Sequence, residues 1–333
     1  MLLHLFRYQL VGAIDHPEQF RGGDGHMLEG GYAVNSNTKE IKRPRFHQGL
    51  WALGFLSAPS VVILFFLGLP VAWGIYISFT NLALTGPQAA HPNFVGLANY
   101  VHLFTSGLFW LSIKASLEYL AGSGLIGQVG LGLALAFIIR RIPLGFRQFL
   151  VGLIVLSWVI PEIVTAFIWS SYLQTPGGLF DSVIGILGVL PQPWLYKDPM
   201  LFLVIANIWR GTAFSMLVFS AAIESIPGEL IDAAQIDGAN RFQMFGRVML
   251  PMIRNSIATA LVLITLWTLS DFTLIYVLTS GGPGYATDVL PVFTYQNSFS
   301  FYELGYGTAL SIVLLLIASG LSLLYLRLVG TDY

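Results

Sequence analysis

The feature that most constrains this chain is a set of long apolar segments, each exceeding the roughly 20 residues that a helix needs to cross a bilayer. Six segments qualify: residues 51–80, 109–139, 146–171, 200–224, 252–279 and 305–329. Because an open strand in lipid leaves its backbone polar groups unpaired, each segment is expected to be helical. Prolines inside the segments, such as Pro59, Pro70 and Pro161, are interpreted as kinks that neighbouring helices cover. The sequence therefore predicts an all-α membrane protein with six transmembrane helices.

The composition excludes several other classes of protein. Charged residues make up only 10% of the 333 residues, against about 25% in an average soluble domain. A soluble protein with an outsized core would need polar helix faces, which these segments lack. The chain has no cysteine, which rules out disulfides and thiolate metal sites. A net charge of −1 argues against a nucleic-acid partner.

The distribution of basic residues predicts the orientation of the chain. Most of the 16 lysines and arginines fall in residues 1–50, in the loops after the second and fourth segments, and at the end of the sixth. The opposite loops, 81–108, 172–199 and 280–304, contain only Lys197. By the positive-inside rule, both termini are expected to be cytoplasmic.

The N-terminal segment, residues 1–46, is predicted to be a cytoplasmic tail preceding a permease domain at 47–333. It begins MLLHLFRYQLVGAI, which lacks the basic start and the cleavage site of a secretory signal, and which suits a short amphipathic helix. A polar, glycine-rich linker follows. His26 and Glu29 in this linker are too few ligands to close a metal site, so no metal is expected.

Two motifs inside the apolar segments are interpreted as structural. Gly122, Gly124 and Gly127 match a dinucleotide-binding spacing, but no strand precedes them. We interpret them, with Gly130 and Gly132, as a surface of small residues against which another helix packs. An intramembrane serine or aspartyl protease is disfavoured because no histidine lies within a segment and Asp271 is the only aspartate well inside one. No phosphate-binding loop is present.

The most informative stretch is the loop between the fourth and fifth segments, residues 225–251, which reads SIPGELIDAAQIDGANRFQMFGRVMLP. Pro227 is expected in a first helical turn, and Gly238 suits the left-handed position that ends a helix. Asn240 and Gln243 have the spacing of a capping box for a second helix over 241–249. The loop is therefore predicted to be an ordered helix, break and helix. Leu230, Ala233, Ala234 and Asp237 would share one shallow face of the first helix.

The same loop resembles the "EAA" loop of ABC importer permeases. Its residues Asp232-Ala-Ala-Gln-Ile-Asp-Gly-Ala239, followed by Val248-Met-Leu-Pro251, depart from the usual pattern only in that Asp232 replaces the first glutamate. The flanks resemble carbohydrate permeases of the maltose and glycerol-phosphate type, in Ile208-Trp-Arg210, Ile226-Pro-Gly-Glu-Leu230, Leu274-Ile-Tyr-Val-Leu-Thr-Ser-Gly-Gly-Pro283, Thr287 and Tyr306-Gly-Thr-Ala309. The resemblance covers about residues 50 to 330.

This resemblance implies a type I ABC importer transmembrane domain in a bacterial inner membrane, surrounded by lipid. It implies three kinds of partner: a second permease subunit that usually is a different chain, two ATPase subunits, and an external solute-binding protein. The chain itself would be non-catalytic and would bind no cofactor, since ATP and Mg²⁺ belong to the ATPase. The residues implied to couple it to the ATPase are Glu229, Asp232, Ala233, Ala234, Asp237, Gly238, Ala239, Leu250 and Pro251.

Polar side chains within the apolar segments are the candidates for the solute path, because such residues are costly in lipid and usually functional. The main candidates are Asn207, Trp209, Arg210, Trp267 and Asp271. Lys114, Glu118 and Glu162 are further polar candidates, although Lys114 and Glu118, four residues apart, could simply pair with each other. Trp267 and Asp271, four residues apart, would offer a sugar an aromatic face and a hydrogen-bonding acid. Asn207 and Trp209 point to different sides of a helix, and Arg210 could equally be an interhelical tie. An ion-coupled secondary transporter is the alternative function, although we find no internal repeat.

Overall fold

The computed structural model describes residue 57 and residues 59–329, and the fold below is that of the unit Ser60–Tyr333 within these limits. All the regular elements described are helices, and the one β-bridge, between Thr80 and Phe94, is isolated. This agrees with the predicted all-α class. The predicted N-terminal tail, residues 1–46, lies outside the described residues.

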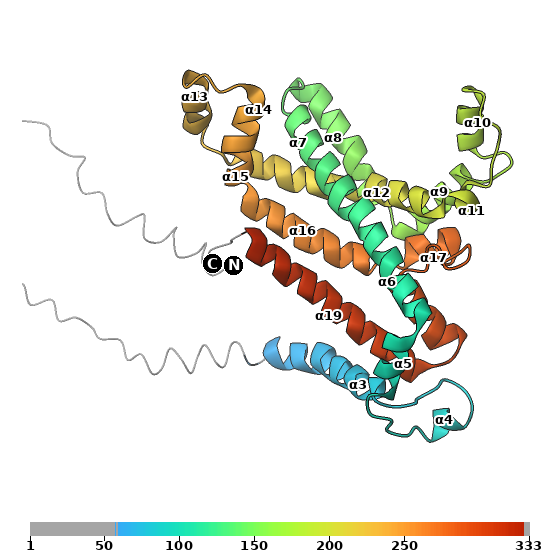
Figure 1. Cartoon of the computed structure of the whole chain (residues 1–333). Helices are drawn as coiled ribbons and strands as arrows, with labels where there is room; N and C mark the ends of the chain where they lie inside the picture. The colour runs from blue at the N-terminus through green and yellow to red at the C-terminus, as the bar shows by residue number, and fades with distance from the viewer. Residues whose placement is uncertain (1–56, 58, 330–333) are drawn as a thin grey trace, which may run out of the picture. The chain divides into compact units, whose positions relative to one another are not determined.

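Four helices are long and apolar enough to cross a membrane (Figure 1). The first is Pro59–Ser78, which includes η1 (Leu64–Gly68) and α3 (Leu69–Ser78). The second runs from Gly107 to Ile139 as α6 (Gly107–Tyr119), the π-helix η2 (Leu120–Gly130) and α7 (Leu131–Ile139). The others are α12 (Pro199–Glu224) and α19 (Leu304–Val329). They match the first, second, fourth and sixth apolar segments.

The third apolar segment is a broken helix. It forms α8 (Leu144–Val159) and α9 (Glu162–Tyr172), which meet at an angle of 100°. Ile160 is extended because the residue before a proline avoids the helical conformation, and Pro161 then leads into α9. The 16 residues of α8 span about 24 Å, less than the roughly 30 Å of hydrocarbon. The expectation of a merely kinked helix was therefore wrong here.

The fifth apolar segment is also interrupted. Its main helix, α16 (Arg254–Leu269), ends ten residues before the predicted limit, and a separate helix, α17 (Thr273–Thr279), follows Ser270, Asp271 and Phe272. At its other end α16 is bent by 70° from the helical stretch Arg241–Met252. Within the described residues, four unbroken helices are long and apolar enough to cross a membrane, and six such spans result only if each bent pair counts as one.

The two short helices that follow these breaks, α9 and α17, pack against each other and against α12. Their contact forms a core of fully buried apolar residues that includes Ala166, Leu274 and Ile275. Further short helices belong to the connections between the long ones. They are α4 (Pro87–Ala90), α5 (Ala98–Thr105), α10 (Leu179–Gly185), α11 (Trp194–Lys197), α18 (Leu290–Tyr295) and η4 (Gln296–Ser300).

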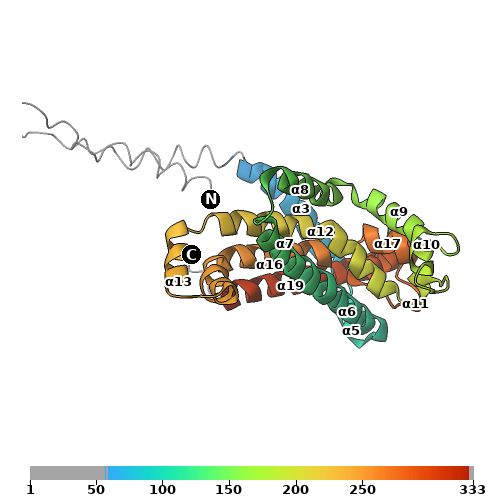
Figure 2. The ribbon, with the colours of Figure 1, turned by 90° about the horizontal axis from the view of Figure 1, so that it is seen from above.

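The predicted small-residue surface is present between the second crossing helix and α12, which cross in both views (Figures 1 and 2). A Cβ atom on Gly122 would lie 3.2 Å from Val204, and one on Gly127 or Gly132 would collide with Ile208 or Ser215. The prediction was wrong for Gly130, which has open space around it. Glycines at these close positions allow the two backbones to approach closely.

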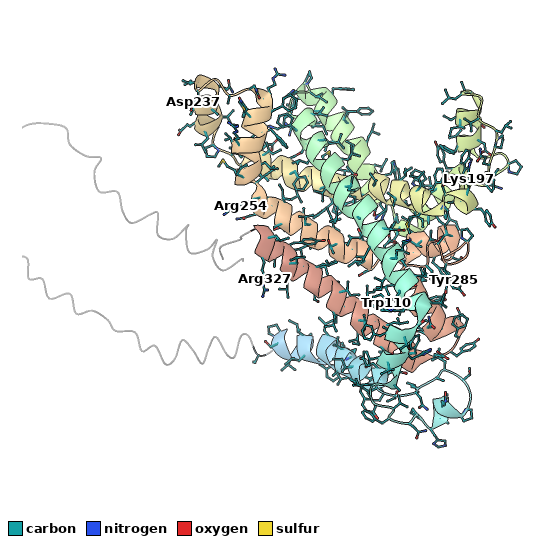
Figure 3. The ribbon with its side chains drawn as sticks, viewed as in Figure 1. Trp110, Lys197, Asp237, Arg254, Tyr285 and Arg327 are labelled. Atoms are coloured by element: carbon teal, nitrogen blue, oxygen red, sulfur yellow. The ribbon has the colours of Figure 1, made fainter. Side chains whose placement is uncertain are left out.

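The loop between α12 and α16 has the predicted helix, break and helix. It comprises α13 (Gly228–Ile236), α14 (Arg241–Gln243), η3 (Met244–Met249) and α15 (Leu250–Met252). Asp237, Arg254 and Arg327 lie toward one end of the described unit, while Lys197 and Tyr285 lie toward the other (Figure 3). Pro227 does not occupy the first turn but precedes α13 as its N-cap.

Candidate functional site

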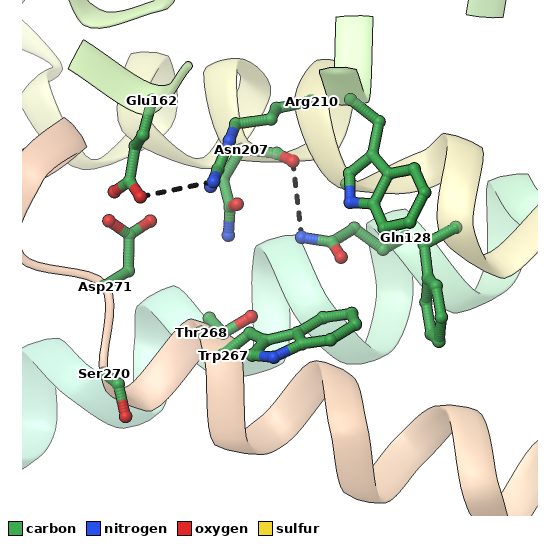
Figure 4. A pocket seen from close by; sticks show the side chains of 11 residues that line it. Gln128, Glu162, Asn207, Arg210, Trp267, Thr268, Ser270 and Asp271 are labelled. Atoms are coloured by element: carbon green, nitrogen blue, oxygen red, sulfur yellow. Dashed lines mark hydrogen bonds and ion pairs between the residues drawn. The ribbon is translucent and has the colours of Figure 1, made fainter. Parts of the chain in front are cut away.

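A pocket of about 320 Å³ lies between α12, α16, η2 and the α8–α9 break (Figure 4). Its lining combines charged, amide and aromatic side chains from segments far apart in the sequence. The residues are Gln128, Trp158, Glu162, Asn207, Arg210, Gly211, Phe214, Trp267, Thr268, Ser270 and Asp271. A mixed pocket of this kind is the usual form of a small-molecule site.

An ion pair occupies one wall of the pocket. The Nη2 atom of Arg210 donates to the Oε2 atom of Glu162 at 3.2 Å, and the other Glu162 oxygen accepts a hydrogen bond from the backbone N–H of Leu274, also at 3.2 Å. Leu274 lies in the first turn of α17, where backbone N–H groups lack helical partners. Glu162 therefore joins α9, α12 and α17. Arg210 combines the two roles considered for it, as an interhelical tie that also lines the pocket.

The carboxyl group of Asp271 lies next to that of Glu162, on the same side of the pocket (Figure 4). Tyr119 donates its hydroxyl hydrogen to the Oδ2 atom of Asp271 at 2.6 Å, whereas the Oδ1 atom has no partner within the described part of the chain. We had expected Asp271 and Trp267 to share a helix face, but α16 ends at Leu269 and Asp271 lies in the break beyond it. Both residues nevertheless line the pocket.

Two amide side chains extend the polar wall. Gln128 donates from Nε2 to the backbone carbonyl of Asn207 at 3.3 Å. Asn207 donates from Nδ2 to the hydroxyl of Ser123 at 2.8 Å. Both amides are buried, so these bonds fix their orientation.

Aromatic rings form the opposite wall. Trp267 is 49% exposed, and its ring meets Phe214 edge to face at a centroid distance of 4.7 Å. Phe214 in turn contacts Trp158. Trp209 lies outside this lining and packs against Trp169. The structure therefore brings together four of the five candidate path residues and leaves Trp209 apart.

Lys114 and Glu118 lie away from this lining and pair with each other at 3.6 Å, with both side chains well exposed.

The chemistry of the pocket is that of binding, through hydrogen bonds, one free carboxylate oxygen and an aromatic face. In the part of the chain that the structure covers, no group of three or more metal-ligating residues comes together.

The second candidate site is the exposed surface of α13 and the break after it. Gly238 has a φ of 76°, as expected for a left-handed helix end, and Asn240 forms the predicted capping box with Gln243. No residue of α13 is buried, and Ile236 is 87% exposed. Leu230 and Phe242 of the same loop are exposed as well, and several exposed apolar side chains together suit a surface that a partner covers.

The base of the loop is anchored in the helix bundle. Ile226, Met249 and Ile253 are buried in one core with residues of α7, α12 and α16, and Ile231 of α13 packs against that core. Leu250 and Pro251 belong to the short helix α15 that leads into α16. A force on α13 would therefore reach the helices that line the pocket.

Sequence reasoning missed several pocket residues, among them Gln128, Trp158 and Phe214, which were hidden among glycines or apolar neighbours. It also missed Tyr119, which holds Asp271 from outside the lining. Glu162 was named as a polar candidate but was not among the main five. Its position directly after Pro161 was the available signal, because a helix start after a break places a carboxylate near free backbone N–H groups.

The fold and these two sites define a class: a multi-span helical membrane protein with a polar pocket among its helices and an ordered helical loop at one end. The comparisons with known proteins agree. Residues 128–330 match the family model described as binding-protein-dependent transport system inner membrane component.

Related sequences and structures extend beyond that match. The trehalose/maltose transport permease MalF of Thermococcus litoralis is 33% identical, covering 83% of this chain and 92% of the relative. The sulfoquinovosyl glycerol transport permease SmoG of Agrobacterium fabrum is 30% identical, covering 83% and 89%. A chain of a bacterial alginate ABC importer has the same fold, with a TM-score of 0.70 at 23% identity, covering 87% of this chain and all of that one.

The chain therefore belongs to the family of binding-protein-dependent transport system inner membrane components. It is a multi-pass permease subunit of an ABC importer in the inner membrane, and it is not itself an enzyme. The alternative of an ion-coupled secondary transporter is wrong.

Proposed function

We propose that this subunit forms half of the import path for a neutral saccharide and that the pocket containing Trp267 is part of that path. The pocket carries the proposal, because it pairs an exposed aromatic face with hydrogen-bonding groups at the α8–α9 and α16–α17 breaks. The printed name of one relative supports this class of solute, because trehalose and maltose are neutral sugars. The name of a second relative, for sulfoquinovosyl glycerol, supports a sugar but one that carries a sulfonate.

The charges of the pocket favour a neutral solute over an anionic one. Arg210 is already paired with Glu162, and no other described residue that lines the pocket is basic. Lys114, which could have attracted an anion, lies outside the lining. An anionic sugar would therefore find no unpaired cation in the pocket to offset its charge.

The coupling role rests on the exposed loop. In this proposal Glu229, Asp232, Ala233, Ala234, Asp237, Gly238 and Ala239 seat α13 in an ATPase subunit, while Leu250 and Pro251 pass the motion to α16. Asp232 and Asp237 are exposed and free to meet basic groups of that partner. ATP and Mg²⁺ bind the ATPase, and this chain requires no cofactor of its own.

The assembly and topology that we propose are those of the family. Two ATPase subunits and a second, different permease chain complete the transporter, and a solute-binding protein delivers the sugar. One solved relative of the same fold is a bacterial alginate importer in complex with its alginate-bound periplasmic protein. Six crossings place both termini in the cytoplasm, with residues 1–46 as a tail and 47–333 as the permease domain.

The proposed solute is tested with the reconstituted importer and a panel of mass-detected neutral sugars, acidic sugars, amino acids and peptides. Trp267→Ala is expected to raise the KM for the transported sugar while the complex still assembles. Trp209→Ala is the matched control, because Trp209 is similarly exposed but lies outside the pocket. Uptake of amino acids or peptides alone, or equal effects of the two variants, would refute the proposal.

A further inference from the structure

A second, larger cavity lies at the α13 end of the bundle, between α7 and the α14–η3 arm, with a volume of about 610 Å³. Its walls are largely apolar and include Leu133, Ala134, Phe137, Ile138 and Phe245. Two arginines, Arg141 and Arg241, also line it. Neither the solute path nor the coupling surface uses this groove.

The two arginines are available to a ligand. The ion pairs formed among the described residues involve neither Arg141 nor Arg241. The guanidinium of Arg141 lies 4.7 Å from the ring centroid of Phe137, which holds it over the apolar wall. Nearby Arg147, in contrast, is already paired with Glu224. The groove therefore combines free positive charge with an apolar floor.

The depth of the groove indicates what fills it. Gly130, at its far end, precedes the last residue of α7, Ile139, by nine positions along a crossing helix. At 1.5 Å per residue this is about 13 Å, close to the ~15 Å thickness of half the hydrocarbon layer. Arg141 lies just beyond Ile139, where a lipid headgroup would be.

We propose that this groove is a binding site for one anionic phospholipid, with Arg141 and Arg241 on the phosphate and an acyl chain against Phe137, Ile138 and Ala134. Basic pockets between helices at a membrane surface suit anionic headgroups. The groove's apolar depth matches an acyl chain. The inference rests on the proposed topology only in assigning this end to the cytoplasmic leaflet.

Such a lipid would lie beside the coupling loop. Arg241 begins α14, and Phe245 belongs to η3, so the ligand would contact the arm that joins α13 to α16. The site is distinct from the solute pocket, with which it shares no residue. Its loss would therefore alter lipid binding without removing the proposed sugar contacts.

The test uses the complete importer, purified in detergent and titrated with phosphatidylglycerol or phosphatidylcholine while native mass spectrometry counts bound lipids. The variant is Arg141→Gln with Arg241→Gln. We expect the preference for phosphatidylglycerol to fall roughly 30-fold. Arg140→Gln is the matched control, because Arg140 is an exposed neighbour that does not line the groove, and it should retain the preference.

A second variant separates the headgroup from the chain. Ala134→Trp fills the groove while leaving both arginines, and it should lower binding of phosphatidylglycerol as well. Unchanged phosphatidylglycerol binding in both variants would overturn the proposal. Loss of the ATPase subunit from the double variant, with lipid binding unchanged, would overturn it too and assign the surface to that partner. Neither readout depends on which sugar is transported, so this proposal and the proposed function fail separately.

Discussion

Replacing Gly132 by alanine tests the close packing of the second crossing helix on α12. The new methyl group would lie 3.0 Å from the backbone nitrogen of Met216 and closer still to the Cβ atom of Ser215. Comfortable separations are about 3.5–4.0 Å, and a backbone cannot turn aside as a flexible side chain can. The helices would have to separate by at least ~0.5 Å, and overpacking of this kind costs about 1–3 kcal/mol.

Gly130→Ala is the control that isolates the free-energy cost of overpacking. Nothing lies within 4 Å of a Cβ atom at Gly130, so the substitution adds helix propensity, about 1 kcal/mol, without a clash. Because both variants gain similar propensity, the difference in their free energies of unfolding should equal the packing cost, about 1–3 kcal/mol. Denaturant titration of the purified permease, followed by circular dichroism, measures that difference. Equal stability of the two variants would refute the packing argument.

Three further outcomes are expected. Gly238→Asp should leave a complete complex that no longer transports its solute. The reason is that an L-residue at a φ of 76° strains the end of α13 by about 1–2 kcal/mol. Normal uptake of the solute by this variant would contradict the coupling role. Asn240→Ala removes the capping box and should destabilise the loop by about 1 kcal/mol, visible as faster amide exchange in α14 but not in α19. Burial raises the pKa of Asp288, in the loop before α18, from 3.8 to about 7, so the folded state keeps a proton that the unfolded chain loses. The free energy of unfolding should therefore fall by up to ~4 kcal/mol as the pH rises from about 4 to above 7. Asp288→Asn should raise the melting temperature at pH 8 but not at pH 4. An equal effect of the substitution at both pH values would contradict this.

Local signals in the sequence predicted local structure well. The left-handed Gly238 and the Asn240 capping box depend only on residues a few positions apart, and both were confirmed. The position of the apolar segments was confirmed where they form long helices. Their continuity could not be predicted from hydropathy, because α9 and α17 are themselves largely apolar. At Pro161 a signal existed, but at Ser270 and Asp271 neither proline nor glycine marks the end of α16.

The lining of the pocket was harder to predict because it depends on helix register. Gln128 lies in η2, an 11-residue π-helix, whose i→i+5 hydrogen bonds rotate each face relative to an α-helix. A helical wheel with 3.6 residues per turn therefore misplaces Gln128 and Ser123. Trp158 and Glu162, four residues apart, both line the pocket although the chain turns by 100° between them. Residues at that spacing would share one face of a straight helix, and the turn alters the direction from which each side chain enters the lining.

The breaks in the third and fifth segments explain why the polar groups of the pocket are tolerated in the bundle. A break leaves backbone groups without helical partners, and these require a hydrogen bond when water is absent. Glu162, at the start of α9, supplies one to Leu274 at the start of α17 and also pairs with Arg210. The break between α8 and α9 thus places the carboxylate of Glu162 where it accepts a hydrogen bond from the backbone left unpaired at the break between α16 and α17. It follows that α9 and α17 should move as one unit relative to α12, with Arg210 as the contact across which the pocket changes shape.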